Sequence, residues 1–201
     1  SMDDMALDVI ALMDELDIET AHIIGISMGG FIAQLLAAKY PTRVLSMASI
    51  MSGSGLVDLT LIDSLWSVPR SREEYIQEWV DYIRQFGSKQ YFEGDDYSRR
   101  IAAAAFDRCY SPDGANRQLL AIFSRKNPKD WVKSISVPTL VVHGSDDLLI
   151  SPSRGQETAR IIPNATFQLI DGMGHDIPPR LGKLLADVVL AHILKDANCK
   201  T

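Results

Sequence analysis

Cysteine is scarce in this chain. Only Cys109 and Cys199 occur among 201 residues, and no C-x-x-C pair is present. A disulfide framework or a structural zinc site needs more thiols than this, so neither is expected. The sequence also lacks a basic segment followed by an apolar one at its start, because Met2 is followed at once by the acidic residues Asp3 and Asp4. It therefore predicts no secretory signal peptide and a cytoplasmic location.

Long apolar runs and an excess of positive charge are absent as well. No run approaches the roughly 18 to 20 residues that cross a bilayer, so a membrane protein is not expected. Twenty Lys and Arg against 26 Asp and Glu give a net charge of −6. An acidic chain without a basic stripe binds polyanions poorly, so nucleic acid is not an expected partner. Hydrophobic residues at 46% and charged residues at 23% are typical of a globular protein.

Short apolar runs alternate with amphipathic segments along the chain. The strand-like runs are residues 21–26, 44–51, 139–142 and 166–170. The helix-like segments are residues 3–16, 31–39, 153–161 and 181–194. This alternation predicts an α/β fold with a mostly parallel sheet and helices on both faces. The run of residues 21–26 is apolar throughout, which predicts a strand that is buried on both faces.

The stretch of residues 56–130 interrupts this alternation, because it has helical patterns but no strand-like run. We expect residues 1–55 and 131–201 to form the core, and residues 56–130 to form a helical insertion. This insertion could lie over the sheet as a lid, or its helices could simply pack with no role in substrate access. Its aromatic residues predict either a pocket for an apolar group or the insertion's own core; they include Trp66, Trp79, Tyr82, Phe86, Phe106 and Phe123.

Residues Gly25-Ile26-Ser27-Met28-Gly29 form a G-x-S-x-G motif between a predicted strand and a predicted helix. This context is typical of a nucleophile elbow, a sharp turn that exposes a serine at the carboxyl edge of a sheet. The flanking glycines are expected to relieve clashes there, and the helix N-terminus favours a developing negative charge. The alternative is a glycine-rich turn in which Ser27 only caps the helix.

A serine nucleophile needs a base, and four histidines are available. His175 is the best candidate, because it lies in a glycine-rich loop directly after the last predicted strand. Its alternative role is that of a histidine that caps a turn. His22 begins a strand and is expected to be structural, and His192 is expected to lie on the surface of the last helix or in its packing. His143 ends the strand before the predicted acid, so we expect a neighbour of the acid rather than the base.

The base needs an orienting acid, and Asp146 and Asp147 both follow the strand of residues 139–142. Adjacent side chains in an extended turn cannot both face one imidazole. The chain order Ser27, Asp147, His175 matches the order Ser, Asp, His of the nucleophile-elbow enzymes and favours Asp147. Alternatively, both aspartates only stabilise the turn by bonding its backbone.

Three segments resemble the α/β-hydrolase superfamily, and the resemblance extends over essentially the whole chain. They are Gly-Ile-Ser-Met-Gly-Gly at residues 25–30, Val-Pro-Thr-Leu-Val-Val-His-Gly-Ser-Asp-Asp at residues 137–147 and Gly-Met-Gly-His at residues 172–175. In that family the acid usually falls three residues after the glycine of the second segment, which is Asp147 after Gly144. Residues 172–192 are similar to aclacinomycin methylesterase-like serine esterases.

The resemblance implies carboxylic ester hydrolysis without a metal or a cofactor. Ser27 would be the nucleophile, His175 the base, Asp147 the acid, and the Met28 N–H a donor of the oxyanion hole. A serine at the elbow argues against haloalkane dehalogenases and epoxide hydrolases, whose nucleophile is an aspartate.

The N-terminus departs from the family pattern, because only 24 residues precede Gly25. Family members place about four strands and another helix there, including the loop that gives the second oxyanion donor. The resemblance therefore implies the C-terminal part of a hydrolase fold. His143 and Gly144 belong to the acid turn and cannot replace that loop, and losing one donor costs about 100- to 1,000-fold in turnover. The strand of residues 21–26 would then have an unpaired edge, which predicts a homodimer or a partner chain that supplies the missing half.

The leading prediction is a serine hydrolase that cleaves a small-molecule carboxylic ester through an acyl-enzyme on Ser27. The alternative from another class is a truncated, catalytically compromised hydrolase fragment with a binding or assembly role. A cofactor-free perhydrolase or a carbon–carbon hydrolase would use the same three residues, so the sequence leaves these chemistries open.

Overall fold

A parallel sheet lies at the centre of the part of the chain that the structure describes. The computed structural model describes residues 1–55, 68, 70–124 and 129–198. The strands of this sheet, in spatial order, are β1 (Ala21–Ile26), β2 (Val44–Ile50), β3 (Thr139–Gly144) and β4 (Thr166–Ile170). The predicted strands and the α/β class are confirmed. Because the strands are parallel, their carboxyl ends meet at one edge of the sheet.

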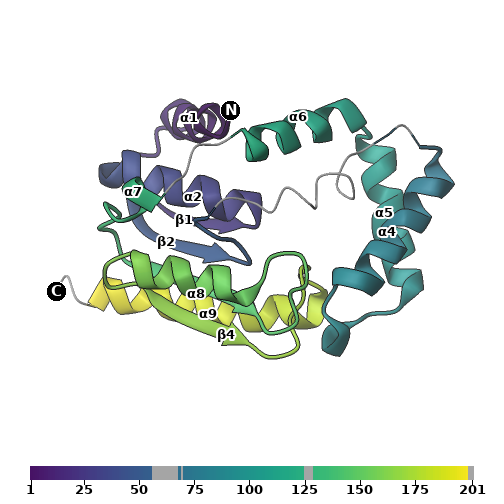
Figure 1. Cartoon of the computed structure of the whole chain (residues 1–201). Helices are drawn as coiled ribbons and strands as arrows, with labels where there is room; N and C mark the ends of the chain where they lie inside the picture. The colour runs from purple at the N-terminus through teal and green to yellow at the C-terminus, as the bar shows by residue number, and fades with distance from the viewer. Residues whose placement is uncertain (56–67, 69, 125–128, 199–201) are drawn as a thin grey trace.

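Helices cover both faces of this sheet (Figure 1). They are α1 (Met2–Glu15), α2 (Met28–Lys39), α8 (Pro152–Ile161) and α9 (Pro179–Asn198), with a short 3₁₀ turn η1 (Pro41–Arg43) after α2. The helices α1, α2 and α8 lie on one face, and α9 lies on the other. Within the described ranges, no helix combines the length and apolar character that crossing a membrane requires.

Each face of the sheet has its own apolar core. Side chains alternate along a strand, so Met47 of β2 lies on the α2 side of the sheet and Ala48 on the α9 side. Both side chains are at most 2% exposed. The α2-side core includes Phe31, Leu36, Met47, Val132 and Ile135. The α9-side core includes Ala48, Ile50, Val142, Leu181 and Leu185.

Helices occupy the described part of the chain between β2 and β3. They are α4 (Arg72–Phe86), the 3₁₀ turn η3 (Lys89–Tyr91), α5 (Asp95–Arg108), α6 (Pro112–Phe123) and α7 (Lys129–Val132). In Figure 1, α4 and α5 lie side by side beyond the carboxyl edge of the sheet. In contrast, α6 and α7 return to the core, because Ala121 and Val132 are buried on its α2 side. The predicted boundary at residue 130 falls inside α7.

The aromatic rings of the insertion contact one another. The ring centroids of Trp79 and Tyr82 are 5.9 Å apart, and those of Tyr82 and Phe86 are 5.2 Å apart. Phe106 stacks on Tyr110 at 4.4 Å. These contacts support the second role predicted for the aromatic residues, a core of the insertion itself; Trp66 lies outside the described residues.

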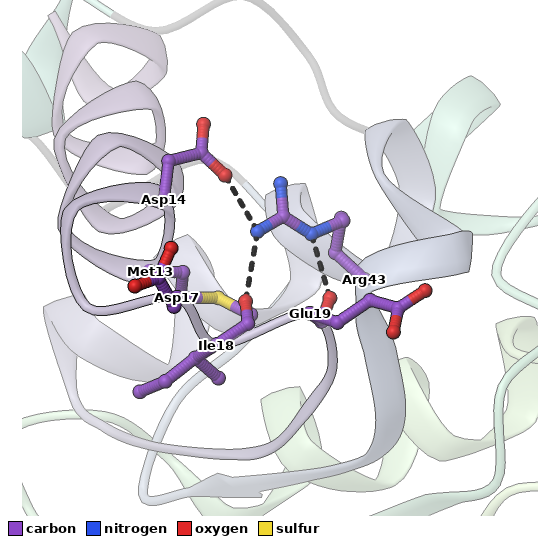
Figure 2. Close-up of a pocket in the computed structure, with 6 residues that line it drawn as sticks. All are labelled: Met13, Asp14, Asp17, Ile18, Glu19 and Arg43. Atoms are coloured by element: carbon purple, nitrogen blue, oxygen red, sulfur yellow. Dashed lines mark hydrogen bonds and ion pairs between the residues drawn. The ribbon is translucent and has the colours of Figure 1, made fainter.

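A single arginine fixes the connection between α1 and β1 (Figure 2). Arg43 Nε donates to the carbonyl of Glu19 at 2.8 Å, and its Nη2 donates to the carbonyl of Ile18 at 3.0 Å. The same Nη2 pairs with Asp14 at 2.7 Å. These contacts line an open pocket of about 440 Å³ and tie the end of α1 to the start of β2.

The prediction that β1 is buried on both faces is wrong. Ile24 and Ile26 are 52% and 44% exposed. Among the described residues β1 pairs with β2 alone, so it forms an edge of the sheet. The buried residues of the α9-side core come from β2, β3, β4, α9 and the loops between them. The face of β1 that carries Ile24 and Ile26 is therefore left uncovered. An apolar run indicates a strand but not its position in the sheet.

We expect this chain to associate in solution, because exposed isoleucines next to an unpaired strand edge favour pairing with another strand. Light scattering at micromolar concentration should give a mass above 22.2 kDa, and Ile24→Lys should lower that mass. The matched control is Leu120→Lys, which changes a comparably exposed side chain, 51% exposed, on α6. A wild-type monomer that unfolds cooperatively would contradict this prediction.

Candidate active site

Ser27 lies in a sharp turn between β1 and α2, as the motif predicts. Its backbone has φ 52° and ψ −118°, a conformation that residues other than glycine adopt only when the surrounding structure imposes it. The Ser27 N–H donates to the carbonyl of Ile50 on β2 at 2.9 Å. Its carbonyl accepts from the N–H of Gly30 at 2.9 Å, inside the first turn of α2. The turn is therefore fixed on both sides.

The two glycines of the motif have different roles. A Cβ atom added to Gly25 would lie 2.1 Å from the carbonyl oxygen of Gly29 and 2.7 Å from the Cα of Gly30. Both of these are backbone atoms, which cannot rotate away. A Cβ added to Gly29 would meet nothing within 4 Å. The expectation that both flanking glycines relieve clashes therefore holds for Gly25 and not for Gly29.

The structure brings together the three residues that the sequence singled out. His175 Nε2 lies 2.9 Å from Ser27 Oγ, and His175 Nδ1 lies 2.8 Å from Asp147 Oδ2. Because an ionised carboxylate only accepts hydrogen bonds, Nδ1 carries the proton and Nε2 accepts from the Ser27 hydroxyl. His175 is 8% and Asp147 is 3% exposed, so water competes little for the hydrogen bond between these two residues.

Asp147, and not Asp146, faces the imidazole. Asp147 Oδ1 accepts from the N–H groups of Leu149 and Ile150 at 3.0 and 2.8 Å. Burial of the carboxyl group favours its neutral form, but the hydrogen bonds from His143, His175 and the Ile150 N–H outweigh burial and lower the pKa of Asp147 to about 2. Asp146 is exposed and accepts from Ser145 Oγ at 2.9 Å. Asp147 is therefore a carboxylate at neutral pH.

His143 is a second imidazole beside the acid. Its ring is fully buried, and Nε2 lies 2.8 Å from the carbonyl oxygen of Ile150 and 3.3 Å from Asp147 Oδ2. Among the described residues Nδ1 has no hydrogen-bond partner, and a Cβ on Gly155 would lie 2.5 Å from it. Both neighbours of Nε2 are acceptors, a carbonyl and a carboxylate oxygen, so Nε2 carries a proton. The sequence placed His143 next to the acid but did not indicate this contact.

The other two histidines lie elsewhere. His22 Nδ1 bonds Ser46 Oγ at 2.7 Å, between β1 and β2, and His192 lies on α9.

The acid turn and the base loop are packed backbone against backbone. A Cβ on Gly144 would lie 2.0 Å from the carbonyl oxygen of Met173. The Asp146 N–H donates to that same oxygen at 2.9 Å, and the Ser145 N–H donates to the carbonyl of Ile170 at 2.9 Å. The two loops that carry Asp147 and His175 are therefore bound to each other through their backbones, in addition to the contact between the two side chains.

Helix α2 begins directly after Ser27, and helix α4 of the insertion brings a tyrosine near Asp147. The Met28 N–H is the first of α2, and the first N–H groups of a helix have no acceptor within the helix. Such an N–H group is free of the helix's own hydrogen bonds and can donate to a negative charge. From α4, Tyr82 approaches the acid: burial and the charges of Asp147 and Asp176 raise the pKa of its hydroxyl to about 12.

Comparisons with known proteins agree with this fold. Residues 1–178 match the family model described as the alpha/beta hydrolase fold. The chain is 24% identical over 216 residues to the rhodomycin D methylesterase of Streptomyces peucetius, covering 94% of this chain and 72% of that protein.

Two further relatives differ in their reactions. The chain is 27% identical over 173 residues to the 2-hydroxy-6-oxononadienedioate/2-hydroxy-6-oxononatrienedioate hydrolase of Cupriavidus pinatubonensis, covering 82% of this chain and 58% of that protein. It matches the crystal structure of the enol-lactonase from Burkholderia xenovorans LB400 with a TM-score of 0.80 and 22% identity, covering 96% of this chain and 73% of that one.

The two glycines of the motif give a paired stability prediction. Gly25→Ala should lower the free energy of unfolding by about 1–3 kcal/mol or more, because β1 and α2 must separate to admit the methyl group. Gly29→Ala should leave it unchanged or raise it by up to about 1 kcal/mol, because alanine favours a helix. Urea unfolding of both variants checks this. Equal losses in the two variants would contradict the assigned contact.

Proposed function

The chain belongs to the α/β-hydrolase fold family, and we propose that it is a serine hydrolase that cleaves a carboxylic ester. The single observation that carries this proposal is the hydrogen-bonded series from Ser27 through His175 to Asp147. Nucleophile, base and orienting acid at these distances form the arrangement that activates a serine hydroxyl for acyl transfer.

In the proposed reaction Ser27 Oγ attacks the ester carbonyl while His175 Nε2 takes the hydroxyl proton. The Asp147 carboxylate stabilises the imidazolium that forms, and the Met28 N–H donates to the oxyanion. His175 then gives the proton to the leaving alcohol, which leaves an acyl-enzyme on Ser27. In the second half His175 deprotonates a water molecule that attacks the acyl carbon; the bond from the acyl carbon to Ser27 Oγ then breaks, and His175 returns the proton to Oγ as the acid product leaves.

The ester as substrate class is supported by the methylesterase among the relatives. A second candidate is hydrolysis of a carbon–carbon bond, which is favoured by the similarity to the hydrolase of Cupriavidus pinatubonensis. Both reactions use the same three residues, so the choice depends on the pocket. Assaying one panel of methyl esters, aryl esters and vinylogous diketones would separate the two chemistries.

The serine assignment is tested with a fluorophosphonate probe, which reacts only with an activated serine. We expect labelling of the wild type and none of Ser27→Ala. Ser153→Ala, at the exposed N-terminus of α8, is the matched control and should label like the wild type. Absence of labelling in the folded wild type would contradict the hydrolase proposal and favour a binding or assembly role.

The acid assignment is tested by comparing Asp147→Asn with Asp146→Asn. An amide NH₂ at Oδ2 would oppose the Nδ1 proton of His175, so the ring would adopt the Nε2–H tautomer and could not accept from Ser27. We expect kcat/KM for p-nitrophenyl acetate to fall roughly 10³- to 10⁴-fold in Asp147→Asn. Asp146→Asn should lose much less, because its side chain is exposed and points away. A larger loss in Asp146→Asn would overturn the assignment.

A further inference from the structure

The loop that carries His175 is bound by the helical insertion as well as by the sheet. Residues Phe86, Gly87 and Ser88 at the end of α4 lie against residues 174–176 of that loop. The His175 N–H donates to the carbonyl of Phe86 at 2.6 Å. The N–H of the preceding residue, Gly174, donates to Ser88 Oγ at 2.9 Å. The backbone on the N-terminal side of the imidazole is therefore held by α4.

Ser88 also holds the residue that follows His175. Its Oγ and its N–H both donate to Asp176 Oδ1, at 2.5 and 2.7 Å. Ser88 is 2% exposed, so water competes little for the atoms of these charge-assisted bonds. A serine hydroxyl has one proton, so giving it to Asp176 leaves the oxygen lone pairs for Gly174. One hydroxyl thus joins the residues on both sides of His175.

Two glycines make this contact rigid. A Cβ on Gly174 would lie 2.5 Å from the carbonyl carbon and oxygen of Gly87, and a Cβ on Gly87 would lie 3.1 Å from Asp176 Oδ2. At Gly174 backbone therefore meets backbone, with no side chain between the two that could adjust. A shift of the end of α4 would move the loop with it.

We propose that Ser88 and Asp176 are positioning residues for His175, so that the helical insertion sets the geometry of the catalytic histidine. This inference rests on the proposed function, in which His175 is the base. The imidazole must keep hydrogen-bond distance to Ser27 and to Asp147 at the same time, at 2.9 and 2.8 Å. Since misplacing a reacting group by about 1 Å costs roughly 100-fold, small shifts of the loop reduce turnover.

The variants distinguish the effect of losing the hydrogen bonds between Ser88 and Asp176 from the effect of losing packing at these positions. Asp176→Ala removes both bonds that Ser88 makes to Oδ1, whereas Ser88→Ala removes the Oγ bonds to Asp176 and Gly174 and leaves the bond from the backbone N–H. Asp176→Asn is the conservative variant, because its Oδ1 still accepts from both donors of Ser88. The matched control is Tyr91→Phe, which removes the 3.2 Å bond from Tyr91 to the carbonyl of Asp171. That bond also joins the insertion to the same loop, but at a residue farther from His175.

The kinetic measurement uses p-nitrophenyl acetate, with thermal unfolding as a check on the fold. We expect kcat to fall roughly 10- to 100-fold in Ser88→Ala and Asp176→Ala with KM little changed. Asp176→Asn should retain most of the activity, and Tyr91→Phe should match the wild type. If Ser88→Ala does not fold, the comparison of Asp176→Ala with Asp176→Asn decides. Wild-type kcat in a folded Asp176→Ala would overturn the proposal.

The second measurement does not need activity. The Nδ1–H of His175, bonded to Asp147, should give a low-field proton NMR signal that is absent in His175→Gln. We expect this signal to broaden or shift upfield in Ser88→Ala and Asp176→Ala and to stay in Asp176→Asn and Tyr91→Phe. Its persistence in both alanine variants would overturn the positioning role. An intact signal in a wild type that neither hydrolyses esters nor reacts with fluorophosphonate would instead overturn the proposed function alone.

Discussion

Where β1 meets α2, the backbone of Gly25 lies so close to that of Gly29 that no side chain fits between them. This contact presses the start of α2 against β1, so the residue that joins them must turn sharply. Ser27 accordingly has φ 52° and projects from the carboxyl edge of the sheet beside the first N–H of α2. The rest of the site is arranged around this turn, since an imidazole can reach its hydroxyl only from that edge.

The histidine that reaches Ser27 is supported from two directions. On the sheet side, Gly144 lies against the backbone of Met173, which joins the acid turn to the base loop. On the other side, the end of α4 holds the loop through Phe86 and Ser88. Both contacts are made by backbone or by one short side chain, which leaves His175 little freedom. In this arrangement the insertion is bound to the loop that carries His175.

Electrostatics at the site centre on one buried carboxylate. Asp147 lies near four donors: the N–H groups of Leu149 and Ile150, and the rings of His143 and His175. Together they offset the cost of burying its charge and hold its pKa at about 2. A carboxylate that stays charged fixes the tautomer of His175, and this leaves Nε2 able to accept from Ser27.

The sequence by itself determined the order and type of the secondary-structure elements, the sharp turn at Ser27 and the loop position of His175. These follow from local patterns: apolar runs, helical spacing and glycines next to polar residues. The sequence also favoured Asp147 over Asp146 and predicted an unpaired edge at residues 21–26, but only the tertiary structure decided that Ile24 and Ile26 of β1 are exposed and that Ser88 bonds Asp176. Each of these depends on how segments far apart in the chain pack, 88 residues apart for Ser88 and Asp176, and no local pattern encodes such a contact.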